Sequence, residues 1–375
     1  MGNTLIAPSI PDILDEFDVG DAGAGAIIAA TSLPGVFLAP VIGLLADRFG
    51  RRNLLVPCFV TFGAAGLFVA AAPTFPALLA GRFMMGVGAA GLINLAVVLI
   101  GDHWSGTDRT RLIGRNAAFL TACLAVLPPL GGGIADAFSW RAALLPYGLA
   151  IVFAAFAWRT LDASRPSGGA SLGEQLRGAG AVIRRPGRIT VFVSAMLLFV
   201  QIFGSFLAAV PLHLEDEFGF GASLRGLFIA IPAIPSTIAA FNLERLQAGL
   251  GTRRLLVASG VVLTVGFLLM GAAEVAVLFA LGAFVYGFGE GAAIPALQNL
   301  AVSAATADVR GAVTAVFVSA ARAGQTIGPL AAAALFGATS TSTALLAGAV
   351  VGGLLTVLFV FGPVPRPAED ALAAP

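Results

Sequence analysis

Eleven apolar stretches, each about as long as a helix that crosses a lipid bilayer, dominate this sequence of 375 residues. A transmembrane helix needs about 20 predominantly apolar residues. Short segments with charged or turn residues separate the stretches. They cover residues 22–45, 54–72, 76–100, 115–135, 141–158, 189–210, 224–243, 255–273, 276–299, 313–336 and 342–362. The sequence therefore predicts an all-α polytopic membrane protein.

The composition excludes a soluble fold and several classes of function. Hydrophobic residues make up 58% of the chain and charged residues 11%, against about 25% charge in an average globular domain. The net charge is +1 and all basic residues are Arg, so nothing indicates nucleic-acid binding. Both cysteines lie inside apolar runs, and His103 and His213 are 110 positions apart. We therefore expect no disulfide framework, no metal site and no cofactor.

The arginines predict the orientation of the chain in the membrane. Seventeen of them fall on one side of the predicted crossings and only Arg141 and Arg225 on the other, while Arg82 and Arg322 lie within the membrane. Because positively charged loops stay in the cytoplasm, we expect the 159–188 connection and the C-terminal tail to be cytoplasmic. The predicted location is the cell membrane.

A shift of 201 positions superimposes the two halves of the chain. It places Pro34 on Pro235 and carries Gly81, Gly86 and Gly88 onto Gly282, Gly287 and Gly289. Transporters are often built from such duplicated bundles. We predict two six-helix halves in parallel repeat, with an N-terminal bundle 1–158, a linker 159–188, a C-terminal bundle 189–362 and a tail 363–375.

The first ten residues are apolar but too short to cross a bilayer. In the repeat they align with the second half of a helix that begins near Ile189. We therefore expect about a dozen residues of the first helix to be missing from this sequence, through either a start codon placed too late or a natural truncation.

The loop after the first complete crossing has the sequence Gly-Leu-Leu-Ala-Asp-Arg-Phe-Gly-Arg-Arg over residues 43–52. It closely resembles the helix 2–3 loop signature of the major facilitator superfamily, which implies the major facilitator fold. The resemblance implies a conformational latch at the cytoplasmic face, formed by Gly43, Asp47, Arg48, Gly50, Arg51 and Arg52. The alternative is that the arginines only set topology. The second copy has Ala248 where Asp47 would be, so only the first loop should act as a latch.

Two further segments resemble motifs of that family. Residues 81–90 look like its second motif, in which the Arg, here Arg82, is assigned to proton coupling. An Arg within a helix costs about 2.5–3.5 kcal/mol to insert, and the alternative is that it reaches the interface. Residues 124–133 partly resemble the motif of drug:proton antiporters, but Leu124 and Pro128 replace its glycines. Residues 324–329 contain a better copy.

A few polar residues lie deep in the predicted crossings. Glu290 is the one acidic residue near the middle of a crossing and Arg322 the one basic residue there. We assign both to proton coupling together with Arg82, the alternative being a permanent ion pair between adjacent helices. The side chains expected to line a central substrate cavity are Asn94, Gln201, Ser205, Tyr286, Gln298 and Gln325. Such a cavity, with few fixed charges, favours a hydrophobic or amphipathic solute.

These observations predict a monomeric secondary transporter, and the resemblance to the major facilitator superfamily implies a 12-helix member of drug:proton antiporter type. Two bundles would alternate access to a site near the bilayer midplane and export a small molecule in exchange for protons. Uptake or uniport of a metabolite is the first alternative, and a transport-inactive receptor or assembly protein is another. The crossings contain no paired acids, no His-metal spacing and no Ser/Lys couple, so we expect no enzyme. The absence of a GxxxxGK[ST] loop argues against a nucleotide-driven pump.

Overall fold

The computed structural model describes residues 2–104, 106–161, 187–303, 310–336 and 338–363. Every regular element in these ranges is helical. The side chains of some helical residues, among them Gly43, Asp47 and Asn94, lie outside the described part. Most of the predicted linker and tail also lies outside it.

Nine segments of the described chain are long and apolar enough to cross a membrane, by length and composition. They are Arg51–Ala70, Phe75–Leu92, Ala118–Ala137, Trp140–Thr160, Arg188–Phe218, Ala222–Phe241, Thr252–Gly271, Ala276–Val302 and Thr341–Phe361. The other two predicted crossings are the helices α2 (Ala22–Phe49) and α16 (Arg310–Phe336). In α2 the apolar portion is the shorter segment Ala22–Leu38. In α16 the polar side chains of Arg322 and Gln325 lower the mean hydropathy.

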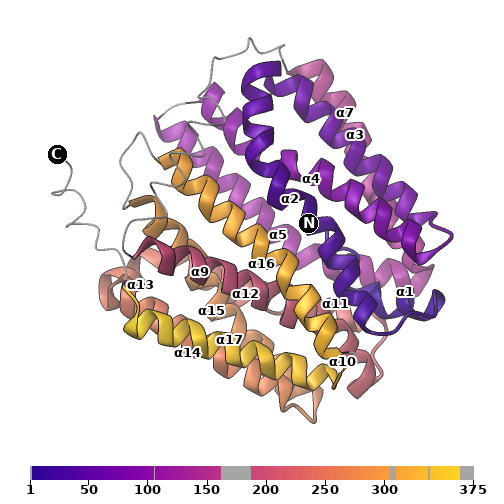
Figure 1. Ribbon diagram of the computed structural model, residues 1–375, viewed down its shortest axis with the longest axis vertical. Coiled ribbons are helices and arrows are strands. Elements are labelled where there is room, and N and C mark those ends of the chain that lie inside the picture. Colours follow the sequence, from indigo (N-terminus) through magenta and orange to yellow (C-terminus); the bar gives the residue numbers. More distant parts are fainter. Residues whose placement is uncertain (1, 105, 162–186, 304–309, 337, 364–375) are drawn as a thin grey trace. The chain divides into compact units, whose positions relative to one another are not determined.

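The chain forms two compact units, of which unit 1 comprises Met1–Leu172 and Phe220–Leu227. Within unit 1, α4 packs against both α2 and α3, and α7 packs on α3 (Figure 1). The elements of this unit are η1 (Ala7–Ser9), α1 (Ile10–Glu16), α2, α3 (Arg51–Ala70), α4 (Phe75–His103), α5 (Gly106–Ala137), α6 (Trp140–Leu144), η2 (Leu145–Gly148) and α7 (Leu149–Thr160).

Unit 2 comprises Gly173–Gly219 and Phe228–Pro375. In it, α14 packs against α15 and α17, α16 packs against α9 and η3, and α12 packs against α15. Its elements are α9 (Arg188–Val200), the π-helix η3 (Gln201–Ala208), α10 (Ala209–Phe218), α12 (Ala233–Phe241), α13 (Leu243–Leu250), α14 (Thr252–Gly271), α15 (Ala276–Ser303), α16 and α17 (Thr341–Phe361). Helix α11 (Ala222–Ala230) begins in unit 1 and ends in unit 2. The predicted domain boundaries stay a prediction.

Short polar side chains determine where several of the helices begin. Thr74 accepts a hydrogen bond from the backbone N–H of Ala77 at the start of α4. Ser139 does the same for Ala142 at the start of α6, and Ser340 for Thr343 at the start of α17. Each cap satisfies a backbone donor that the first helical turn leaves unpaired. In this way polar residues between apolar stretches set the lengths of the helices.

The backbone repeats at the spacing that the sequence predicts. Positive φ angles occur at Asp18 (52°) and at Gly219 (62°), which are 201 positions apart. They recur at Gly50 (88°) and Gly251 (75°), again 201 apart, each between two successive helices. These features confirm the predicted repeat of two half-chains.

The same spacing recurs in the packing of glycines inside each unit. A Cβ atom added at Gly86 of α4 would lie 2.9 Å from Cγ of Pro34 in α2. A Cβ atom added at Gly287 of α15 would lie 2.7 Å from Cγ of Pro235 in α12. Each contact lets two helices approach more closely than larger side chains would allow. The two halves therefore share internal packing as well as sequence.

Candidate functional site

Arg82 lies in α4 with its side chain fully buried inside unit 1. Its Nε donates to the carbonyl oxygen of Ile27 at 3.2 Å, and its Nη1 donates to the carbonyl oxygen of Gly2 at 2.7 Å. Nη2 donates to Oδ1 of Asn3. The hydroxyl of Tyr147 donates to the same Gly2 oxygen at 2.8 Å. One guanidinium thus joins α2, α4 and the segment before η1.

The hydrogen bonds that this buried cation donates in the described part of the chain go to neutral acceptors. Backbone carbonyls and an amide oxygen satisfy the N–H groups of Arg82, and the Sδ atom of Met85 lies 3.8 Å from Nη1. The side chain therefore does not extend to water, which was the alternative for an Arg near a helix end. A cation held by dipoles alone can respond to a charge that arrives nearby, because no fixed carboxylate in this group neutralises it.

Glu290 lies in unit 2 on the buried face of α15. Residues on the same face include Ala283, Tyr286, Ala293 and Leu297, all of them buried. The side chains of Tyr286 and Glu290, one helical turn apart, interact with each other. The Tyr286 hydroxyl makes no hydrogen bond of ordinary geometry in the described part of the chain. An ionisable residue within a membrane helix is a candidate for a functional role.

Aromatic rings surround Tyr286. The ring of Phe206 stacks on it with centroids 4.8 Å apart and an interplanar angle of 17°. The ring of Phe267 meets it edge to face at 5.1 Å. This packing fixes the tyrosine and leaves its hydroxyl beside Glu290. This phenol is the side-chain group that interacts with Glu290, which is itself half-buried.

Arg322 lies in the middle of α16, and its Nη1 donates to Oε1 of Gln325 at 3.1 Å. Among the described residues, no ion pair joins Glu290 to Arg322. The two charged residues that the sequence places in the middle of unit 2 therefore have separate neutral partners. This differs from the permanent ion pair that was the alternative reading of the sequence.

The predicted cavity residues occupy different surroundings. Gln201 is fully buried and its Nε2 donates to the carbonyl oxygen of Gly348 in α17 at 2.7 Å. Ser205, on the same π-helix, is also buried, whereas Gln298 is exposed. The side chain of Asn94 lies outside the described residues. A π-helix is rare and is often found at functional sites, and this one contains two of the predicted cavity residues.

The predicted latch residues lie at the junction of α2 and α3. Arg48 is exposed, and its Cζ lies 5.6 Å from the centroid of the Phe49 ring. Arg52 donates from Nη1 to the carbonyl oxygen of Leu161 at 3.1 Å and stacks on Trp158 at 4.3 Å. It thereby binds the C-terminal end of α7 within unit 1. Arg51 begins α3 after Gly50, and the side chains of Gly43 and Asp47 are not described.

Sequence reasoning missed part of both clusters. It did not assign a role to Tyr147 or include Asn3 as a partner of Arg82. The chain has only two tyrosines, and each lies beside a charged residue within the membrane, Tyr147 beside Arg82 and Tyr286 beside Glu290. This scarcity was an available signal. In the described residues, no group of three His, Cys, Asp or Glu side chains could hold a metal ion.

The profile of the Major Facilitator Superfamily matches residues 1–249 and 192–374 of this sequence. The chain belongs to this superfamily. It is 25% identical over 348 residues to the bacillibactin exporter of Bacillus subtilis, covering 89% of this chain and 86% of that protein. It is 28% identical over 366 residues to the class G tetracycline resistance protein of Vibrio anguillarum, covering 91% and 88%.

A solved structure supports the same fold. The crystal structure of a bacterial homologue of the human lysosomal transporter Spinster aligns with a TM-score of 0.79. The alignment covers 96% of this chain and 92% of that one at 15% sequence identity. The family match and these relatives make this Major Facilitator Superfamily protein a multi-pass membrane transporter and not an enzyme.

Proposed function

We propose that this transporter exports a hydrophobic or amphipathic small molecule in exchange for protons by alternating access. Relatives named as a bacillibactin exporter and as tetracycline resistance proteins support export. We also propose that the protein resides in the cell membrane with its C-terminus in the cytoplasm. The distribution of the arginines supports this orientation.

The observation that carries proton coupling is the position of Glu290. Its carboxyl lies on the buried face of a membrane helix beside the hydroxyl of Tyr286, and no ion pair engages it among the described residues. A charged carboxylate in apolar surroundings is costly, and gaining a proton removes that cost. Glu290 is the proposed proton carrier. Arg82 and Arg322 respond to the change in charge, and Gln201, Ser205, Tyr286, Gln298, Gln325 and Asn94 contact the solute.

The direction of flux tests this proposal against uptake or uniport. Purified protein in proteoliposomes is offered a panel of lipophilic cations, antibiotics and small metabolites, and an inward or outward pH gradient is imposed. Exchange predicts that the solute accumulates on the more acidic side. Accumulation on the more alkaline side would indicate cotransport with protons. Flux that does not depend on the pH gradient would indicate uniport. Cotransport and uniport would each contradict the proposal.

We further propose that Asp47 and the arginines around it act as the cytoplasmic latch. The position of Arg48 and Arg52 at the α2–α3 junction supports this role. Asp47→Asn removes the negative charge at nearly constant size, so we expect the transport rate to fall while the amount of folded protein stays the same. Asp108→Asn, in the first turn of α5, is the control at an exposed position. Equal turnover in both variants would refute the latch.

A further inference from the structure

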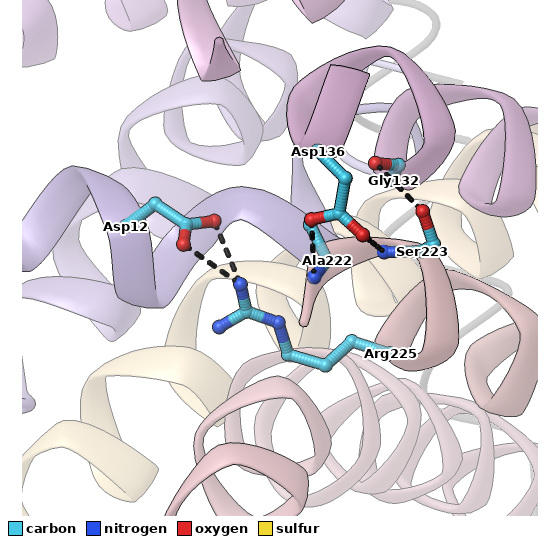
Figure 2. A network of polar contacts seen from close by, with 6 residues as sticks. All are labelled: Asp12, Gly132, Asp136, Ala222, Ser223 and Arg225. Atoms are coloured by element: carbon cyan, nitrogen blue, oxygen red, sulfur yellow. Dashed lines mark hydrogen bonds and ion pairs between the residues drawn. The ribbon is translucent and has the colours of Figure 1, made fainter. Parts of the chain in front are cut away.

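Three side chains of unit 1 gather at the start of helix α11 (Figure 2). Arg225 donates from Nη2 to both carboxylate oxygens of Asp12 in α1, at 2.7 and 2.9 Å. Asp136, at the end of α5, accepts from the backbone N–H groups of Ala222 at 2.9 Å and Ser223 at 2.8 Å. We call Asp12, Asp136 and Arg225 the α11 anchor.

The anchor combines an ion pair with a helix cap. Asp136 places a negative charge at the N-terminus of α11, where unpaired N–H groups and the helix dipole favour it. The side chain of Arg225 is 1% exposed, whereas that of Asp12 is 40% exposed. One partner is therefore buried and the other touches water. Such a pair is stronger than a surface ion pair. When it separates, only one of the two charges is left in a buried environment, because Asp12 is already partly exposed.

Close backbone contacts accompany these polar contacts. A Cβ atom at Gly132 of α5 would collide with the carbonyl oxygen of Ala222, and one at Gly226 of α11 would collide with that of Pro128. The hydroxyl of Ser223 also lies 3.5 Å from the Gly132 oxygen. Glycine on each helix lets the two backbones touch. The antiporter-like segment of α5 thus forms the surface on which the first turns of α11 dock.

The docked segment ends where the chain changes unit. Phe220–Leu227 belongs to unit 1, and the chain from Phe228 onwards belongs to unit 2. Helix α11 ends at Ala230, and the next two residues, Ile231 and Pro232, separate it from α12. Proline has no N–H to continue a helix. The break therefore separates the docked helix α11 from α12.

We propose that Asp12 and Asp136 are positioning residues that hold the first turn of α11 on unit 1 in one state of the transport cycle and release it in the other. This inference rests on the proposed alternating-access function. The contacts of the α11 anchor are polar, and Asp12 is partly exposed. Opening the anchor therefore exposes charged groups that water can solvate. An apolar contact of the same size would expose hydrocarbon instead.

Thiol labelling tests the anchor without any substrate. Ala222 is 1% exposed, so a cysteine there reacts with a membrane-impermeant maleimide only when the anchor opens. The background is Cys58→Ser with Cys123→Ser. We expect Asp136→Asn and Asp12→Asn each to raise the labelling rate of Ala222→Cys about fivefold. The charge swap Asp12→Arg with Arg225→Asp should bring the rate back toward that of the unaltered anchor, which a general loss of packing would not do.

Glu16→Gln is the matched control. Glu16 lies one turn from Asp12 on α1 and pairs with Arg141 at 2.6 Å, while its other carboxylate oxygen accepts from Nε1 of Trp140 at 2.5 Å. Among the described residues, Glu16 makes no ion pair with α11, so the labelling rate should stay unchanged. Equal labelling in the Asp136, Asp12 and Glu16 variants would overturn the anchor.

Reversible cross-linking tests whether release of α11 is required for transport. Asp12→Cys with Arg225→Cys, in the same background, is linked by a bifunctional thiosulfonate and reopened with dithiothreitol. We expect the link to stop solute-driven proton movement in proteoliposomes and reduction to restore this movement. A link between Glu16→Cys and Arg141→Cys should leave the proton movement unchanged. Full activity with the first link in place contradicts the inference. Absence of movement in the unlinked protein would count against the proposed function instead, and the labelling result would still decide the anchor.

Discussion

At the scale of single residues, the least replaceable side chain of unit 1 is Arg82. Its planar guanidinium has a fork-like arrangement of donors: Nε donates to the carbonyl oxygen of Ile27, and Nη1 donates to that of Gly2. A Lys ammonium has three donors at one point and does not reproduce that geometry. Since the acceptors are buried, losing the donors would leave backbone carbonyls without hydrogen bonds. The charge and the geometry of Arg82 therefore both matter, and substitutions can separate them.

We predict that Arg82→Gln lowers the free energy of unfolding by about 1–3 kcal/mol, as expected when buried carbonyl acceptors lose their hydrogen-bond donors. Arg82→Lys should keep the charge, recover part of the stability and still transport more slowly. Tyr147→Phe, which removes only the hydroxyl bound to Gly2, should cost about 1 kcal/mol. Thermal unfolding in detergent measures all three. Stability of Arg82→Lys equal to that of the original chain would show that the fork geometry is unimportant.

At the scale of elements, the joints between helices rely on an unusual backbone conformation. Gly251 has φ 75° and ψ 153° between α13 and α14, and Gly50 has φ 88° and ψ 147° between α2 and α3. This region of the backbone map is essentially restricted to glycine. The two joints occupy equivalent places in the repeat. Each reverses the chain without a long loop, which keeps the successive helices adjacent.

We predict that Gly251→Ala lowers the free energy of unfolding by about 1–3 kcal/mol through backbone strain alone. Nothing lies within 4 Å of a Cβ atom added there, so steric contact does not contribute. Gly249→Ala, two residues earlier in α13, is the control, because it has the same open space without a positive φ. It should be neutral or stabilise by up to about 1 kcal/mol. The same effect in both variants would argue against strain at Gly251.

Helix α16 packs on α9 and η3 through glycines. A Cβ atom added at Gly328 would lie 2.8 Å from Cα of Val200, and one at Gly204 would lie 3.0 Å from Cα of Gly328. The antiporter-like copy at residues 324–329 therefore serves close packing inside unit 2. Small residues of this kind are typical of contacts between membrane helices.

We predict that Gly328→Ala destabilises the protein by about 1–3 kcal/mol, the usual cost of overpacking a tight contact. Gly353→Ala in α17 is the control, because an added Cβ atom there meets no atom within 4 Å. Comparing the thermal unfolding temperatures of the two variants measures the difference. An unfolding temperature for Gly328→Ala that matches the control would show that α16 can move away from α9 at little cost.

At the scale of the whole molecule, the helices could be predicted well because long apolar runs have few alternatives in a membrane. The stretch 76–100 corresponds to α4 (Phe75–His103), and the stretch 276–299 to α15 (Ala276–Ser303). The repeat was predictable because glycines that fit between helices tolerate few replacements. The sequence stretch 224–243 was less informative, because Pro232 divides it into α11 and α12.

The arrangement of the site was harder to predict than the helices. Carbonyl oxygens, such as those of Gly2 and Ile27, bind Arg82 and carry no signature in a sequence. The pair of Asp12 and Arg225 spans 213 positions, so no local spacing indicates it. The distribution of the arginines predicts that Arg225 lies on the non-cytoplasmic side, but it does not pair Arg225 with Asp12. What sequence reasoning lacked was the packing that selects one partner among several.

If Glu290 carries protons during export, the proton movement that a solute drives must depend on its carboxyl group. Proteoliposomes containing the original chain, Glu290→Gln or the loop control Glu274→Gln receive lipophilic cations, antibiotics and small metabolites in turn. We expect proton movement with at least one solute for the original chain and for Glu274→Gln, and none for folded Glu290→Gln. Equal proton movement in Glu290→Gln would show that Glu290 does not carry the protons.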